Sequence, residues 1–159
     1  MSRSLGNQLP PPVAALLDGE QLDAKAGHVF LLVTRDEAGY PHPAMLSVGE
    51  VLAVNPGRLL LALYSSSTTT RNLRARGKLT LALADGGFGY YVKAAATETA
   101  ATAPDLAGLA VFEATVAEVL EDGESVARVT SGFTMTLAGD TVRTLALWEA
   151  TVGALRALG

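Results

Sequence analysis

Six consecutive hydroxyl side chains, residues 65–70, stand between an apolar run that ends at Tyr64 and a basic segment. The cations of that segment are Arg71, Arg74, Arg76 and Lys78. Hydroxyl groups donate short hydrogen bonds without bulk, and a guanidinium can hold two oxygens of one anion at once. These residue types, in this order, are therefore suited to bind a phosphate group.

The hydroxyl run lies where a strand is expected to pass into a helix. Residues 58–65 have the apolar composition of a strand, and 68–77 read as a short helix, with Ser66 or Ser67 as its N-cap and Gly77 as its C-cap. The first turn of a helix has free N–H groups that favour an anion. A phosphate site is one interpretation of this junction, and a capped helix with a solvated basic face is the other. A triphosphate-binding loop is excluded, because the glycine-rich pattern ending in Gly-Lys-Ser/Thr is missing.

The elements that must position this junction are mostly strands. Six strand regions are expected, at 28–34, 44–54, 58–65, 78–84, 90–96 and 109–122. In 78–84 the leucines alternate with small or polar residues, which is the period of a strand with one buried face. An open sheet of this size would leave exposed edges, so the pattern favours a closed or split antiparallel barrel.

The two ends of the chain differ from this β-rich middle. Residues 1–12 read as an arm that ends in three prolines, and 13–19 as a short helix. The apolar residues between 124 and 137 keep helical spacing, and Asp140 can cap a helix over 141–158. The segment 97–108 looks like an irregular connection with at most a helical turn. We therefore expect a helical C-terminal part over 123–159.

Composition excludes several classes of function. The 159 residues include no cysteine and two histidines, which excludes disulfides, thiolate metal sites and histidine-rich metal sites. The net charge of −4 argues against a general nucleic-acid-binding protein. No apolar run approaches the length of a membrane span, and the N-terminus lacks the pattern of a signal peptide, so a cytoplasmic location is expected.

The phrase "GYPHPAMLSV…GRLLLALYSSSTTTRNLRARGKLTLAL" resembles the pyridoxamine 5′-phosphate oxidase-like FMN-binding split barrels. The shared features are a Gly39-x-Pro41 turn, an aromatic Tyr64 that ends the third strand, the Ser/Thr-rich turn, and the short helix. The resemblance covers about residues 25–122. It implies a mainly β fold, a six-stranded antiparallel split barrel with C-terminal helices, in one domain over 1–159. It also implies a homodimer, which agrees with the positive mean hydropathy of +0.29.

The resemblance assigns roles along two segments. Residues 43–48 would offer main-chain hydrogen bonds to the isoalloxazine ring, and the junction at 65–71 would hold the phosphate of FMN. The expected cofactor-binding residues are Met45, Leu46, Ser47, Tyr64, Ser65, Ser66, Ser67, Thr68, Thr69, Thr70, Arg71 and Arg74. Tyr64 could equally pack in the core or contact the cofactor. Relatives often have Lys or Arg where this chain has Thr69, so Arg71 or Arg74 would have to supply the charge.

By this resemblance, the chain is an FMN-binding flavoprotein, and we expect a flavin-dependent oxidoreductase with a small-molecule substrate that the sequence does not identify. The flavin would carry the electron chemistry, so no catalytic residue is named. The oxidases proper end in an Arg-x-His element that "GALRALG" lacks, so oxidation of pyridoxamine phosphate is not expected. Two alternatives stay open: a non-catalytic module for a flavin or deazaflavin, and an interaction protein whose pocket has decayed. FAD or a deazaflavin are the alternative cofactors, and neither nucleic acid nor membrane is an expected partner.

For two further side chains the sequence allows either a structural role or contact with a ligand. Trp148 lies in an apolar helical stripe, where packing in the core or in a dimer interface is favoured over a wall against a flavin ring. Lys93 lies on a strand among small alanines, where a solvated lysine is favoured over a ligand contact.

Overall fold

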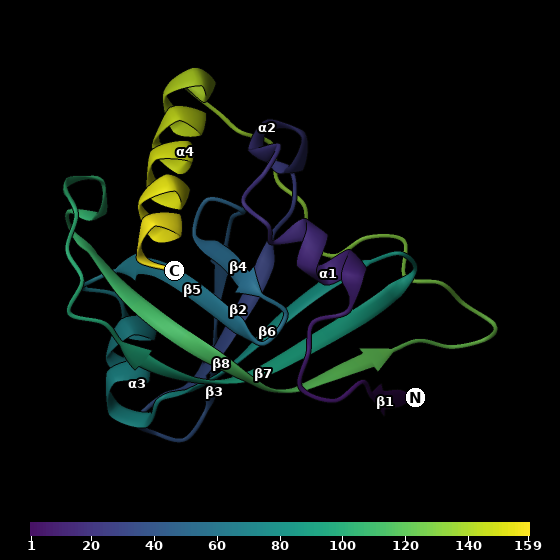
Figure 1. Ribbon diagram of the computed structural model, residues 1–159. Helices are drawn as coiled ribbons and strands as arrows, with labels where there is room; N and C mark the ends of the chain where they lie inside the picture. Colours follow the sequence, from purple (N-terminus) through teal and green to yellow (C-terminus); the bar gives the residue numbers. More distant parts are fainter.

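The centre of the molecule is one curved antiparallel sheet, seen in a computed structural model that describes residues 1–159 (Figure 1). Its strands are β1 (Ser2–Ser4), β2 (Phe30–Arg35), β3 (Pro41–Leu46), β4 (Val51–Asn55), β5 (Arg58–Tyr64), β6 (Lys78–Asp85), β7 (Phe88–Glu98) and β8 (Leu109–Asp122). The helices are α1 (Pro11–Leu16), α2 (Leu22–Lys25), α3 (Thr68–Arg76) and α4 (Thr141–Leu158), with a 3-10 turn η1 (Pro104–Leu106). None of these helices combines the length and the apolar composition that a membrane-spanning helix needs.

The strands follow the order β3-β2-β6-β7-β8-β5-β4, and every pair is antiparallel. The 14-residue β8 pairs with β7 along one edge, and with β5 and then β1 along the other. In Figure 1 the long strands β7 and β8 run beneath the shorter β4 and β5, so the sheet curls around its own core. The predicted class, an antiparallel split barrel with helices, is confirmed.

Strand alternation builds the core inside this curl. In β6 the three leucines at 79, 81 and 83 are buried, as their spacing predicts, and Phe30 and Leu32 of β2 point the same way. They belong to one cluster of 33 buried apolar residues. The opposite faces of β2 and β6 carry Val33, Arg35, Lys78 and Thr80, so the chemistry-bearing side chains of these strands lie on the outer surface.

The predicted count of six strands is wrong, because one expected strand is two and the arm adds another. The region 44–54 divides into β3 and β4 at a tight turn, where the backbone N–H and the hydroxyl of Ser47 both donate to the Glu50 carboxylate, at 2.7 and 2.9 Å. Within the arm, residues 2–4 pair with β8 as β1. The turn was hidden because apolar residues flank it on both sides without a proline or a polar run.

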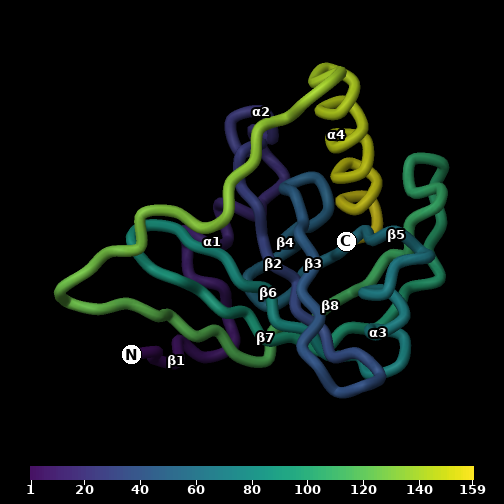
Figure 2. Tube along the Cα trace, turned by 180° about the vertical axis from the view of Figure 1, so that it is seen from behind, coloured from purple at the N-terminus to yellow at the C-terminus, as the bar shows by residue number.

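The predicted helical spacing over 124–137 is also wrong. That segment is irregular, with isolated bridges between Glu124 and Ala127 and between His28 and Thr134. Its apolar residues are not buried as a stripe, since Val126 is 93% and Phe133 62% exposed. Figure 2 shows the segment leaving β8, looping outward and returning along the surface to α4. Apolar residues three or four apart do not make a helix where threonine, serine and glycine separate them and no surface buries the stripe.

The last helix was predicted correctly. Helix α4 spans Thr141–Leu158, and the Asp140 carboxylate accepts a hydrogen bond from the Arg143 N–H, which is the expected cap. Val152 and Leu155 are buried, and the helix packs on β4 and β5 with its first turns projecting beyond the sheet (Figure 1). The short helix expected over 13–19 corresponds to α1, which begins at Pro11 and ends at Leu16. The helical turn expected within 97–108 corresponds to η1.

Candidate functional site

The junction between β5 and α3 is shaped by its own hydroxyl groups. Ser67 is the N-cap, and its hydroxyl accepts the N–H of Thr70 at 3.1 Å. The hydroxyl of the fully buried Thr70 donates to the carbonyl of Tyr64 at 2.8 Å, which ties the helix to the end of β5. Gly77 ends the helix in the left-handed region, at φ +62°, as its position predicts. Ser67 and Thr70 therefore hold the turn in shape.

The rest of the junction presents donors and one cation. The backbone N–H groups of Ser66, Thr68 and Thr69 donate to no other atom of the chain. The exposed Arg71 guanidinium folds back over them, with Nη2 donating to the Thr68 hydroxyl at 2.8 Å and Nη1 to the Ser66 carbonyl at 3.3 Å. Free amides at a helix N-terminus beside a guanidinium are the groups that hold a phosphate.

Arg74 has a different surrounding. Its Nε and Nη2 donate to the two oxygens of Glu98 at 2.6 and 2.7 Å, and its Nη1 donates to the Ser65 carbonyl at 3.2 Å. These hydrogen bonds from Arg74 lower the pKa of Glu98 below its ordinary value, so the pair is ionised and its charges cancel. Arg74 thus connects the junction to Glu98 of β7. Of the two arginines expected to supply the charge for a phosphate, only Arg71 is without an acidic partner.

The expected ring-binding segment lies on an open edge. β3 is the first strand of the sheet order, so one side of its backbone has no strand partner and can hydrogen-bond a ligand. Met45 is 71% exposed, whereas Leu46 and Ser47 are buried. Tyr64 is 70% exposed where β5 meets the junction. Large apolar side chains so exposed at an edge strand and at the neighbouring turn indicate a surface that another molecule covers.

A buried hydrogen bond ties helix α3 to β2, the strand that pairs with β3. The Asn72 side-chain amide in α3 donates to the Thr34 hydroxyl in β2 at 3.0 Å, and both side chains are about 4% exposed. Helix α3 packs against β2, β3, β5 and β7, so it closes this end of the sheet beside the first residues of β3. Sequence reasoning missed both residues, because a polar pair 38 positions apart leaves no local pattern.

Charge is distributed unevenly over the molecule. Six of the twelve Lys and Arg side chains lie within 4.0 Å of a carboxylate. Of the six that do not, four belong to α3 or to the strand ends beside it: Arg35, Arg71, Arg76 and Lys78. The Nη1 atom of Arg76 is buried without a hydrogen-bond partner. A chain of net charge −4 thus has four of its six cations without an acidic partner at one end of the sheet, which favours anions there.

These cations line two separate cavities. The first, here called the helix cavity, has a volume of about 400 Å³ between α3 and the β2–β3 turn, and its polar lining is Asp36, Glu37, Thr68, Arg71, Asn72 and Arg76. Asp36 is held in its own turn, since its carboxylate accepts the Tyr40 N–H at 2.8 Å. Thr68 and Arg71 belong both to the junction and to the lining of the helix cavity, so the two lie side by side.

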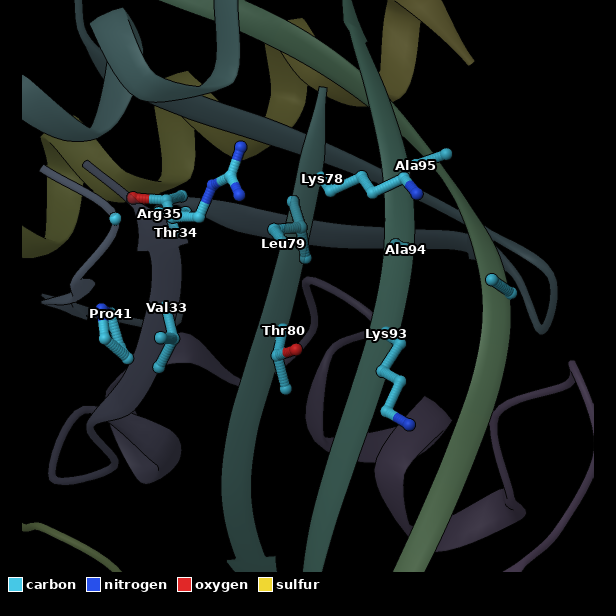
Figure 3. Close-up of a pocket in the computed structure, with 12 residues that line it drawn as sticks. Val33, Thr34, Arg35, Pro41, Lys78, Leu79, Thr80, Lys93, Ala94 and Ala95 are labelled. Atoms are coloured by element: carbon cyan, nitrogen blue, oxygen red, sulfur yellow. The ribbon is translucent and has the colours of Figure 1, made fainter. Parts of the chain in front are cut away.

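The second, here called the sheet groove, lies on the outer face of β2, β6 and β7 and has a volume of about 490 Å³. Figure 3 shows Val33, Thr80 and Lys93 in a row across these strands, with Arg35 and Lys78 at one end of the groove. Sequence reasoning missed Arg35, Lys78 and Thr80 as site residues. The alternation in β6 could have found the last two, because it places them together on the face opposite the buried leucines.

No protein-family model matches the chain. The uncharacterized protein YclD of Bacillus subtilis (strain 168) is 38% identical over 78 residues, which are 49% of this chain and 51% of that protein. The chain therefore spans about half the length of the curated relative that it matches.

Several solved structures have a similar fold. A candidate pyridoxamine 5′-phosphate oxidase from Lactobacillus delbrueckii superposes with a TM-score of 0.56 at 19% identity, over 74% of this chain and 98% of that one. An FMN-binding protein from Syntrophomonas wolfei gives 0.51 at 14% identity, over 69% and 88%. An F420 reductase gives 0.51 at 11% identity, over 70% and 98%. At these identities the similarity concerns the fold.

Proposed function

Because the chain has the fold of the pyridoxamine 5′-phosphate oxidase-like split barrels, we propose that it is a flavoprotein that binds FMN at the junction of β5 and α3. The observation that carries the proposal is the arrangement of Arg71 over the free amides of Ser66, Thr68 and Thr69. Arg76 supports it as well, because this arginine lines the adjoining helix cavity and has no acidic partner within 4.0 Å.

In this proposal the cofactor extends from the junction along the open edge of β3. The phosphate is held by the Ser65–Arg71 segment, and the ring lies beside Met45, Leu46 and Ser47, whose backbone supplies its hydrogen bonds. Arg74 acts indirectly, by fixing the Ser65 carbonyl and neutralising Glu98. The bound flavin supplies hydride or electron transfer, and the residues of the chain bind and orient it. We infer an oxidoreductase that acts on a small molecule.

A deazaflavin is the second candidate cofactor, and the likeness to the F420 reductase supports it as much as the likeness to the FMN-binding protein supports FMN. Oxidation of NADH or NADPH by the loaded protein, measured with an added electron acceptor, distinguishes an enzyme from a module that only stores the cofactor.

The test of cofactor binding is direct. The purified protein is expected to show a flavin absorption band, or to acquire one with added FMN, and its thermal midpoint should rise by about 5–10 °C at a hundredfold excess over Kd. The double variant Ser66→Ala/Arg71→Ala should bind FMN about tenfold or more weakly, since it loses a charge-assisted contact.

Arg143→Ala is the matched control, because this exposed arginine also has no acidic partner but lies in α4. It should bind FMN as the unaltered protein does. A colourless protein whose thermal midpoint does not respond to FMN or to a deazaflavin would contradict the proposal. Unchanged FMN affinity in the double variant would place the phosphate elsewhere.

A further inference from the structure

We propose that the sheet groove is a second anion site, which binds the carboxylate of a small substrate with a flat apolar body. Its role as a substrate site rests on the proposed flavin function, whereas its ability to bind an anion does not. The groove is formed by the register of four strands, with two cations without partners at one end and a bulge in β8 at one wall.

Strand register fixes the floor of the groove. Val33 in β2 pairs with Thr80 in β6, Thr80 with Lys93 in β7, and Lys93 with Glu118 in β8, so four outward side chains form one row. Val33 and Thr80 are partly buried, which leaves a shallow and largely apolar floor. A groove of about 490 Å³ lies in the range of small-molecule sites.

Two cations without partners stand at one end of that row. The β2–β6 register ends at Val33 and Thr80, and two residues further on it would place Arg35 opposite Lys78. Neither side chain lies near a carboxylate or donates a hydrogen bond within the chain. Like charges on neighbouring strands repel, so an anion between them relieves a cost that the free protein carries.

The other end of the row is electrically neutral. The Lys93 ammonium donates to the Glu118 carboxylate at 2.8 Å, and this contact lowers the pKa of Glu118 below its ordinary value. The groove is therefore positive at the Arg35 and Lys78 end and balanced at the Lys93 end. A ligand that matches this polarity has one anionic head and an uncharged body.

An irregularity in β8 lies at one wall of the groove. The β7–β8 register shifts between the pair Lys93 and Glu118 and the pair Ala94 and Val116, so Ala117 is an extra residue that faces no partner. Ala117 lines the groove. Bulges of this kind bend a strand and are common beside active sites. Together with Ala95, it offers a small-residue wall against which a planar ring can lie.

The sheet groove and the helix cavity are separate sites. They share no lining residue, and the β2–β3 turn stands between them, with Asp36–Ala38 on the helix cavity and Gly39 on the sheet groove. One small anion cannot fill both. The cofactor phosphate is assigned to the junction and the helix cavity, which leaves Arg35 and Lys78 for a second anion.

The experiment uses benzoate as the probe, with benzamide as its neutral counterpart, followed by amide chemical shifts in the full-length protein with and without FMN. Benzoate should shift the amides of 33–35, 78–80 and 93–95 with a Kd on the order of 1 mM, and benzamide should bind more weakly. The variant Arg35→Gln/Lys78→Gln should weaken benzoate about tenfold or more and leave FMN affinity unchanged.

The matched control is Arg128→Gln/Arg143→Gln, which removes the other two cations without acidic partners and should leave benzoate binding unchanged. The Ser66→Ala/Arg71→Ala variant should bind FMN about tenfold or more weakly and bind benzoate as the unaltered protein does. Benzoate binding that is equal in the groove variant and the control variant would overturn the inference, as would shifts that map outside the groove. Failure of FMN to bind while benzoate still occupies the groove would refute the flavin proposal and leave the anion site standing.

Discussion

At the scale of single residues, the hydroxyl run separates into residues that hold a shape and residues that face outward. Ser67 and Thr70 use their hydroxyls in the cap and in the bond to Tyr64, whereas Arg71 has no acidic partner and the amides of Ser66, Thr68 and Thr69 have no acceptor. The cap was predictable, because capping depends on neighbours in sequence. The capture of Arg74 by Glu98 was not, because it depends on the approach of β7, 24 residues away.

Glu50 gives a prediction about pH at the same scale. Burial raises the pKa of its carboxyl above the ordinary value of 4.5, although two hydrogen bonds from Ser47 act in the opposite direction. In the window between 4.5 and the raised pKa, the folded protein holds a proton that the unfolded chain has lost, so this group makes the free energy of unfolding fall as pH rises through the window.

The variant Glu50→Gln should remove that fall. Chemical denaturation at several pH values above 4.5 should show the free energy of unfolding of the unaltered protein decreasing relative to that of the variant. A constant difference between the two across that range would contradict the assignment. Because Glu50 holds Ser47 at the end of β3, the same variant also reports on the segment proposed to line the flavin ring.

At the scale of elements, prediction from sequence succeeded where both the ends and the buried face were marked. Helices α3 and α4 have their caps at Ser67 and Asp140, and β6 has its alternating leucines. Prediction failed at 124–137, where the apolar residues have helical spacing but no surface of the protein buries them. It also failed at 47–50, where a turn interrupts a stretch that is apolar on both sides. Trp148 shows what the sequence alone does not contain. A packing role was expected for it, but the surface that it packs against, the β3–β4 turn at Gly49, lies 99 residues earlier in the chain.

Helix α4 packs closely against that turn because Gly49 has no side chain to keep Trp148 away. A Cβ atom added at Gly49 would overlap the indole ring of Trp148 and lie 2.6 Å from the Cβ of that residue. Gly49→Ala should therefore push α4 outward and lower the free energy of unfolding by about 1–3 kcal/mol, measured by chemical denaturation. The matched change Gly153→Ala, within α4 and with open space around it, should instead raise it by about 0.5–1 kcal/mol. Equal effects of the two substitutions on the free energy of unfolding would contradict this close contact between Gly49 and Trp148.

At the scale of the whole molecule, the proposed homodimer would cover the exposed apolar residues at the edge of the sheet. Met45, Tyr64 and Tyr40 are each about 70% exposed and lie on or beside β3 and the junction. Sedimentation should give a particle of about 33 kDa, twice the 16.4 kDa of the chain. Met45→Glu should shift the protein toward the monomer, because burying a charge at an interface is costly.

The control for that substitution is Val142→Glu, at an 80% exposed position in the first turn of α4. It adds the same charge away from the edge strand and should leave the dimer intact. A particle of monomer mass in the unaltered protein, with or without FMN, would refute the dimer. Sequence resemblance suggested the assembly, but which face forms it depends on the strand order, and that order joins residues far apart in the chain.

The position of β8 has a consequence for how the protein is made. Without β8 the sheet consists of two parts, β3-β2-β6-β7 and β5-β4, and β8 is the strand that pairs with both. Its residues, Leu109–Asp122, come late in the chain. During synthesis the first 108 residues can form their local hairpins, yet their apolar faces have no closed sheet to enter. The sheet can therefore close only after β8 has left the ribosome, and this late pairing of residues far apart in the chain is of the kind that slows folding.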